Sequence, residues 1–150
     1  MWRIPLLHSK GDESTNVILL KFLRARDFRV NDAFIMLQNS VAWRKAFGAD
    51  SILEEDLKFD ENLDSVAFMH CFDKVGHPVC YNAYGTFRDK ELYQKIFGDN
   101  EKLKNFLRWR VQILEKGIKL IEFNPGSVNA MVQITHLKNI PKKEMRAASN

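Results

Sequence analysis

The sequence predicts an α/β domain, because long stretches with helical periodicity alternate with short stretches rich in β-branched and aromatic residues. Helical patterns come first, a pair of strand patterns follows residue 65, and another helix leads to a further strand pattern. A strand, a crossover through helices and a further strand form a sheet on which helices pack. The chain has 150 residues, 45% apolar and 28% charged, so it is long enough to bury a core.

Two helices are expected at the start of the chain, over residues 17–26 and 32–47. Asn31 can cap the second helix, and Gly48 stands where helices commonly stop. The buried stripe of the second helix is expected to contain Ala33, Met36, Leu37, Val41 and Phe47. Residues 49–64 carry seven acidic side chains and one lysine, and we expect a short helix and a linker there. This segment predicts a boundary between two subdomains, residues 1–60 and 61–150.

Residues 66–72 (VAFMHCF) and 78–85 (PVCYNAYG) are the expected strands of an antiparallel hairpin, because DKVGH between them has turn chemistry. A short helix over residues 89–97 and a longer one from a cap at Asp99 or Asn100 to about residue 123 follow. The apolar residues expected in register along the longer helix are Leu103, Phe106, Leu107, Leu114, Ile118 and Ile121. Residues 128–137 alternate as a strand, with Val132 and Ile134 on one face and Gln133 on the other.

The last residues of the sequence predict an incomplete domain. Pro141 opens another helical pattern, which stops after barely two turns without a capping residue. Only three strand patterns occur, and so small a sheet has few partners with which to close a core. We therefore expect the fold to be truncated at its C-terminus.

Two arginines in LLKFLRARDF, residues 19–28, raise the question of a binding site. Positions two apart lie about 200° apart around a helix, so Arg24 would point to solvent with Lys21 while Arg26 would leave on the apolar side. A buried guanidinium requires an anionic partner. A carboxylate of the same domain, the carbonyl end of the helix, or a phosphate or carboxylate of a ligand can each supply it. The pattern does not choose among the three.

The same stretch, extended to LLKFLRARDFRVNDAFIMLQNSVAWRKAFG, resembles the N-terminal helical signature of the CRAL-TRIO lipid-transfer family, the family of the yeast phosphatidylinositol-transfer protein. DKVGHPV resembles the family's D-x-x-G-R-P-V hairpin, and VQITHLKN resembles the strand that normally reads hydrophobic-x-D-L-x-G. The leading W-x-I-P-L-L and the segment ELYQKIFGD are most similar to plant patellins. The resemblance implies the CRAL-TRIO lipid-binding fold: an N-terminal helical subdomain followed by the first part of a mixed sheet flanked by helices.

The resemblance further implies a non-catalytic domain without a cofactor, which encloses one lipid, commonly a phosphoinositide or a related phospholipid. Such a domain would present or transfer the lipid at membranes, in vesicle trafficking or cell-plate formation. Arg26 aligns with a family arginine that helps to receive the headgroup phosphate. Three positions depart from the family pattern: Asp27 replaces a common lysine, His77 an arginine and His136 an aspartate.

Two further sets of residues are candidates for lipid and membrane contact. Basic side chains on the outer helical face would attract an anionic membrane surface, and we expect Lys21, Arg24 and Arg29 there. The residues that could line a lipid cavity, although such aromatic residues are core by default, are Tyr81, Tyr84, Phe87 and Gln133. No apolar run approaches the roughly 18 residues that span a bilayer, so a soluble, cytoplasmic chain is expected, and the resemblance implies that it is peripherally membrane-associated.

Other classes of function fit the sequence less well. His70 and Cys71 would face opposite sides of a strand, so they cannot readily bind one metal ion together. His77 and Cys80 alone are too few ligands for a zinc site. There is neither a phosphate-binding glycine loop nor a G-x-S-x-G elbow, so no enzyme is expected. Nucleic-acid binding by the basic helices, Arg44 and Lys45 included, is opposed by the acidic segment. A protein-interaction domain that binds no ligand remains the alternative.

Overall fold

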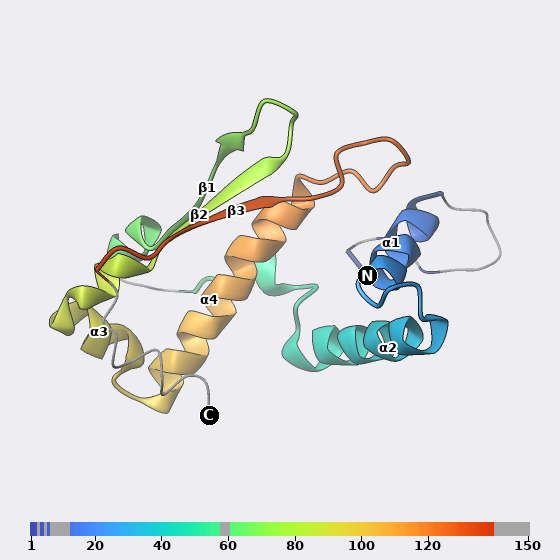
Figure 1. Ribbon diagram of the computed structural model, residues 1–150. Helices are drawn as coiled ribbons and strands as arrows, with labels where there is room; N and C mark the ends of the chain where they lie inside the picture. Colours follow the sequence, from blue (N-terminus) through green and yellow to red (C-terminus); the bar gives the residue numbers. More distant parts are fainter. Residues whose placement is uncertain (3, 5, 7–12, 58–60, 140–150) are drawn as a thin grey trace.

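The structure is a computed structural model, and it describes residues 1, 2, 4, 6, 13–57 and 61–139. The chain folds into helices and strands that alternate as the sequence predicted (Figure 1). The helices are α1 (Glu13–Arg24), α2 (Val30–Phe47), α3 (Lys90–Phe97) and α4 (Asn100–Lys119), with short 3-10 helices η2 (Ile52–Glu54), η3 (Glu61–Ser65) and η4 (Tyr84–Arg88). The strands are β1 (Ala67–Phe72), β2 (Pro78–Ala83) and β3 (Val132–His136).

The three strands form one mixed sheet in the order β1-β2-β3. β1 and β2 are the antiparallel hairpin that the turn chemistry predicted, and β3 pairs with β2 in parallel after the crossover through α3 and α4. In Figure 1 the sheet is seen nearly edge-on with α4 beneath it, while α1 and α2 lie at the other end of the molecule. The predicted α/β class and the mixed sheet flanked by helices are therefore confirmed.

Two apolar clusters hold these elements together. The larger one lies between the sheet, α3 and α4, where Ala67 and Cys80 meet Phe106, Trp109 and Ile113. The smaller one joins α1 and α2 to the segment after α4, and its buried members are Ile18, Phe22, Ala33 and Phe123. The segment after α4 thus packs against the N-terminal helices, and α4 itself lies between the two ends of the molecule.

Capping residues set several helix boundaries as expected. Gly48 ends α2 in the left-handed conformation, with φ of 72°. Asp89 caps α3 by accepting hydrogen bonds from the backbone N–H groups of Glu91 and Leu92, and Asp99 caps α4. The Asn31 cap is wrong, because α2 already begins at Val30 and follows Arg29, whose side chain makes no capping hydrogen bond.

Other expectations about these elements also need correction. α1 ends at Arg24 instead of residue 26, and α4 ends at Lys119 instead of about residue 123. Val41 is exposed, and so are Leu103 and Leu107, because α2 and α4 each bury a narrower stripe than the periodicity indicated. The helix expected to begin at Pro141 lies outside the described residues.

Candidate functional site

One face of the sheet packs closely against α4. At Gly117 of α4, a Cβ atom would lie 2.4 Å from the Met131 sulfur and 3.1 Å from that of Met69, so helix and sheet approach here without room for a side chain. Asn82, buried in β2, accepts a hydrogen bond of 2.7 Å from Arg110 of α4. Burial on this face raises the pKa of the Cys80 thiol. This face is therefore core.

The opposite face of the sheet carries aromatic and aliphatic side chains that are only partly covered. The register places Phe68 and Ile134 on either side of Tyr81, and successive residues of a strand point to opposite faces. The Phe68 and Tyr81 rings stack with their centroids 5.5 Å apart, and the His70 ring meets Tyr81 edge-on. We call this surface the open sheet face; it contains Phe68, His70, Tyr81, Val132 and Ile134, together with Val79, which is buried between His70 and Val132.

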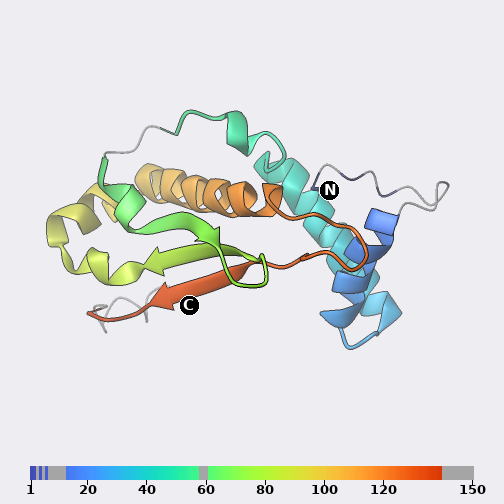
Figure 2. The same cartoon turned by 90° about the horizontal axis from the view of Figure 1, so that it is seen from above.

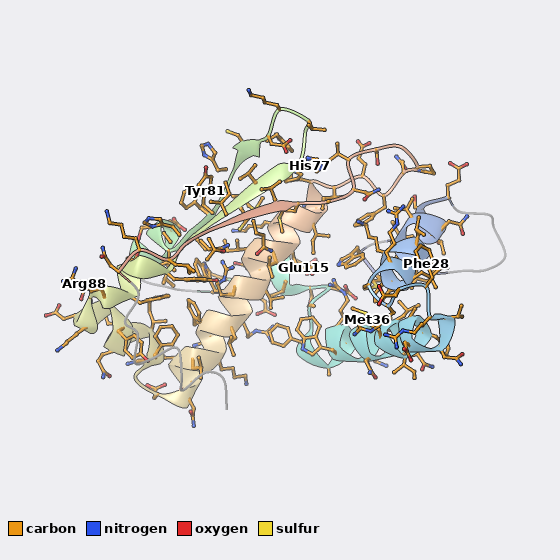
Figure 3. All side chains as sticks on the ribbon, in the orientation of Figure 1. Phe28, Met36, His77, Tyr81, Arg88 and Glu115 are labelled. Carbon is orange, nitrogen blue, oxygen red and sulfur yellow. The ribbon has the colours of Figure 1, made fainter. Side chains whose placement is uncertain are left out.

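Figure 2 looks onto the open sheet face, and no helix of the described residues lies over it. Figure 3 shows Tyr81 on the side of the sheet away from α4. Phe68 and Ile134 are both exposed, and burying their apolar surface would be favourable. The open sheet face is thus a preformed apolar platform beside which a ligand or another part of a longer chain can pack.

The four residues predicted to line a cavity are not on one surface. Tyr81 lies on the open sheet face, whereas Tyr84 and Phe87 pack against the α3–α4 cluster. The Phe87 ring lies 5.8 Å from that of Phe106, so this pair belongs to the core. Gln133 is exposed and pairs in register with Cys80, which places it on the α4 side of the sheet. The sequence analysis did not single out Phe68 and Ile134, although the alternation along residues 128–137 already placed Val132 and Ile134 together.

The turn between α1 and α2 differs from the helix expected through Arg26. Phe28 N–H donates to Leu23 O over 2.8 Å and Asp27 N–H donates to Arg24 O over 3.4 Å, the two hydrogen bonds of a Schellman motif. Asp27 and Phe28 both have positive φ, 50° and 60°. Arg26 is half-buried within this turn, and its Nη1 donates to Ala25 O over 2.8 Å. The expected position of Arg26 on the apolar side of a continuing helix is therefore wrong, while its role in headgroup binding stays a prediction.

The three residues of the expected basic face differ in their surroundings. Lys21 Nζ donates to the backbone oxygen of Asn129 and, over 2.9 Å, to its side-chain oxygen, so Lys21 ties α1 to the loop before β3. Burial, and secondly the nearby Arg24 guanidinium, lower the pKa of Lys21. Lys21 is thus half-buried, which contradicts its expected exposure. Arg24 is exposed, and Arg29 is exposed in an ion pair of 3.1 Å with Asp32.

An ion-pair network that the sequence analysis missed joins α2 to α4. Arg44 is buried, and its Nη1 and Nη2 donate to the two carboxylate oxygens of Glu115 over 2.6 and 3.0 Å. Its Nε also donates to Asp50 over 3.0 Å. Burial by itself lowers the pKa of Arg44, but its hydrogen bonds to the carboxylates of Glu115 and Asp50 outweigh this effect, and the net change raises that pKa. The network borders a hollow of about 480 Å³ that Trp2 and Phe123 also line.

The hairpin turn accommodates His77 in place of the family arginine. Asp73 accepts hydrogen bonds from the backbone N–H of His77 and of Val75, over 2.8 and 2.9 Å, and from His77 Nδ1 over 2.8 Å. These bonds, the His77 backbone first, lower the pKa of Asp73 to about 2. His77 therefore serves as a local partner that helps to hold the turn closed. Within the described chain, no three His, Cys, Asp or Glu side chains are grouped to hold a metal ion.

Comparison with known families defines the class of this fold. The family model described as CRAL/TRIO, N-terminal domain matches residues 1–39, and the CRAL/TRIO domain model matches residues 63–149. The crystal structure of Sfh5 has the same fold, with a TM-score of 0.73 at 22% identity over 97% of this chain and 51% of that one. The chain belongs to the CRAL/TRIO family, which confirms the resemblance read from its sequence.

Within that family, plant patellins are among the similar proteins. Patellin-6 of Arabidopsis thaliana is 55% identical over 150 residues, which cover 100% of this chain and 36% of that protein. Patellin-3 of the same plant is 52% identical over 152 residues, covering 99% and 30%. The phosphatidylinositol transfer protein SFH5 of Meyerozyma guilliermondii is 34% identical over 137 residues, covering 86% and 40%. The chain thus spans about a third of the length of these patellins.

The helices of the described segments include none that is both long and apolar enough to cross a membrane.

Proposed function

We propose that this chain binds the apolar part of a lipid on its open sheet face, as part of a non-catalytic protein that presents or transfers the lipid at membranes. The observation that carries the proposal is the partly exposed row of Phe68, Tyr81 and Ile134 on the side of the sheet away from α4. Burying such a row against acyl chains gains about 25 cal/mol for each Å² of apolar surface removed from water. A phospholipid is the favoured ligand, because SFH5 relatives are named phosphatidylinositol transfer proteins.

Arg26 is proposed to bind the headgroup phosphate of a membrane lipid and not that of the lipid on the open sheet face, because Arg26 lies in the α1–α2 turn with Phe28, which Figure 3 shows remote from the sheet. It is half-buried, and a guanidinium can bind a phosphate through two parallel hydrogen bonds. Asp27 next to it would disfavour a second negative group, so a headgroup with one phosphate fits better than a polyphosphorylated one. Action in vesicle trafficking or cell-plate formation, at the cytoplasmic surface of a membrane, belongs to this proposal.

The proposal is tested by mass spectrometry of lipids that co-purify with the full-length protein. Ile134→Ser is the informative variant, because it adds a hydroxyl to the open sheet face. Leu107→Ser is the matched control, because Leu107 is an exposed aliphatic residue of α4. We expect Ile134→Ser to carry less lipid than the wild type while Leu107→Ser carries the same amount, with equal melting temperatures. Full-length wild type without any bound or exchangeable lipid would instead favour the ligand-free interaction domain.

A further inference from the structure

We propose that the α1–α2 turn and the first turns of α2 form an edge that inserts into an anionic bilayer. Phe28, Val30 and Phe34 form the apolar edge, which would enter the boundary between headgroups and acyl chains. Arg24 and Arg29 would meet lipid phosphates beside it. The inference deepens the proposed function and rests on it, since it assigns the part of the chain that holds the protein on the membrane.

The three residues of the apolar edge are unusually exposed for their size. Phe28 is 61% exposed, Val30 68% and Phe34 57%. Val30 and Phe34 are four residues apart in α2, so their side chains are neighbours on one side of the helix. Val41, eleven residues after Val30 and also exposed, continues the same side at about 20°. Val30 and Phe34 therefore form an adjacent apolar pair next to the turn, and Val41 lies two turns further along the same side of α2.

The conformation of the turn holds Phe28 outward at an energetic cost. Asp27 and Phe28 are consecutive residues with positive φ, and for a bulky side chain that conformation is a genuine outlier. In a Schellman motif the residue at the Phe28 position commonly packs on the residue at the Leu23 position. Phe28 N–H does bond to Leu23 O, yet the ring is largely in solvent. Backbone strain that presents an apolar ring to water indicates a contact made outside this chain.

The charge around the apolar edge favours a bilayer as the occupant. Residues 24–30 contain three arginines and Asp27, so the turn has a net charge of +2. Arg24 is exposed, and the exposed Arg29 pairs with Asp32, whose side chain is itself 45% exposed. An anionic membrane offers phosphates immediately outside an apolar layer, which matches cations next to apolar side chains. An acidic protein groove would have to reproduce both layers.

The position of the apolar edge is compatible with a loaded lipid site. Figure 3 shows Phe28 at the end of the molecule remote from the sheet, whereas Tyr81 lies over the sheet. Insertion of Phe28 would therefore leave the open sheet face unobstructed. The N–H groups of residues 25–29 donate hydrogen bonds to the backbone oxygens of Lys21, Leu23, Arg24 and Arg26, so the turn is already formed and little ordering is needed on insertion.

The test is sedimentation of the full-length protein with vesicles of phosphatidylcholine containing phosphatidylserine. Phe28→Asn removes the ring and supplies a residue that tolerates positive φ, so the melting temperature should stay equal or rise. We expect vesicle affinity to fall about tenfold with Phe28→Asn or Phe34→Ser, and about fivefold with Arg24→Gln. Ile35→Ser is the matched control: Ile35 is 53% exposed but lies about 100° around α2 from Phe34.

Two results would overturn the inference. The first is that Phe28→Asn and Phe34→Ser bind vesicles as tightly as the wild type. The second is that Ile35→Ser loses as much vesicle affinity as they do. The lipid that co-purifies with Phe28→Asn separates this test from that of the proposed function. Unchanged lipid content with weakened sedimentation supports the apolar edge, whereas a lipid-free wild type that still sediments would refute the proposed function alone.

Discussion

Replacing Glu115 by Gln is the sharpest perturbation of the contact between α2 and α4. The Arg44 side chain is 7% exposed, and its partners Glu115 and Asp50 are 12% and 68% exposed. Glu115 accepts two hydrogen bonds from the guanidinium; Glu115→Gln keeps one acceptor oxygen but turns an NH2 group toward the other guanidinium nitrogen and removes the charge that balances a buried arginine, so it should cost about 3 kcal/mol. Asp50→Asn should cost only about 0–1 kcal/mol, because water screens an exposed carboxylate.

Urea denaturation of the three proteins measures these differences in the free energy of unfolding. A double variant, Arg44→Met with Glu115→Leu, should come within about 1 kcal/mol of the wild type, because it removes both buried charges and leaves only the exposed Asp50. If Asp50→Asn cost as much as Glu115→Gln, the burial argument would be refuted. The same holds if Glu115→Gln had no measurable cost, which would mean that water in the adjacent hollow already screens the pair.

At the hairpin turn, the pKa of Asp73 is about 2 in the folded protein against a usual 3.8, so its contribution to stability is present above pH 3.8 and is lost as the pH falls toward 2. Asp73→Asn should therefore unfold with a weaker dependence on pH in that window, as followed by circular dichroism. At the α1–α2 turn, Asp27→Gly should raise the free energy of unfolding by about 0.5–1 kcal/mol, because glycine adopts positive φ without strain. A lower denaturation midpoint for Asp27→Gly than for the wild type would contradict this expectation.

The parts of the fold predicted from the sequence are those that local chemistry determines. Asp89 and Asp99 cap helices wherever the neighbouring backbone N–H groups are free, and the DKVGH turn closes on itself through Asp73. The end of α1 was missed because no glycine or proline marks it. Asp27 occupies the left-handed position that glycine usually takes in this motif, and an aspartate is not by itself a signal that a helix ends.

The candidate site was predicted less completely, because its residues are defined by partners distant in the sequence. Arg44 falls on the same helical side as Ala33 and was counted among surface cations, yet Glu115, 71 residues away, holds it inside the fold. Gln133 and Tyr81 were both cavity candidates, and only the strand register separates them onto opposite faces. Periodicity identifies a buried stripe, but it does not identify which element covers that stripe.

The Lys21–Asn129 bridge and the Arg44 network together alter the electrostatic field that an approaching molecule meets. Both cations have their hydrogen-bond partners within the protein. Lys21 bonds to Asn129 in the loop before β3, and Arg44 bonds to Glu115 of α4. Residues 17–47 carry six basic and two acidic side chains, and two of the six, Lys21 and Arg44, are partly or fully withdrawn from solvent. The outward field of α1 and α2 therefore originates mainly from the exposed Arg24, Arg29 and Lys45. The long-range attraction of an anionic surface should thus be weaker and more narrowly directed than the number of basic residues indicates.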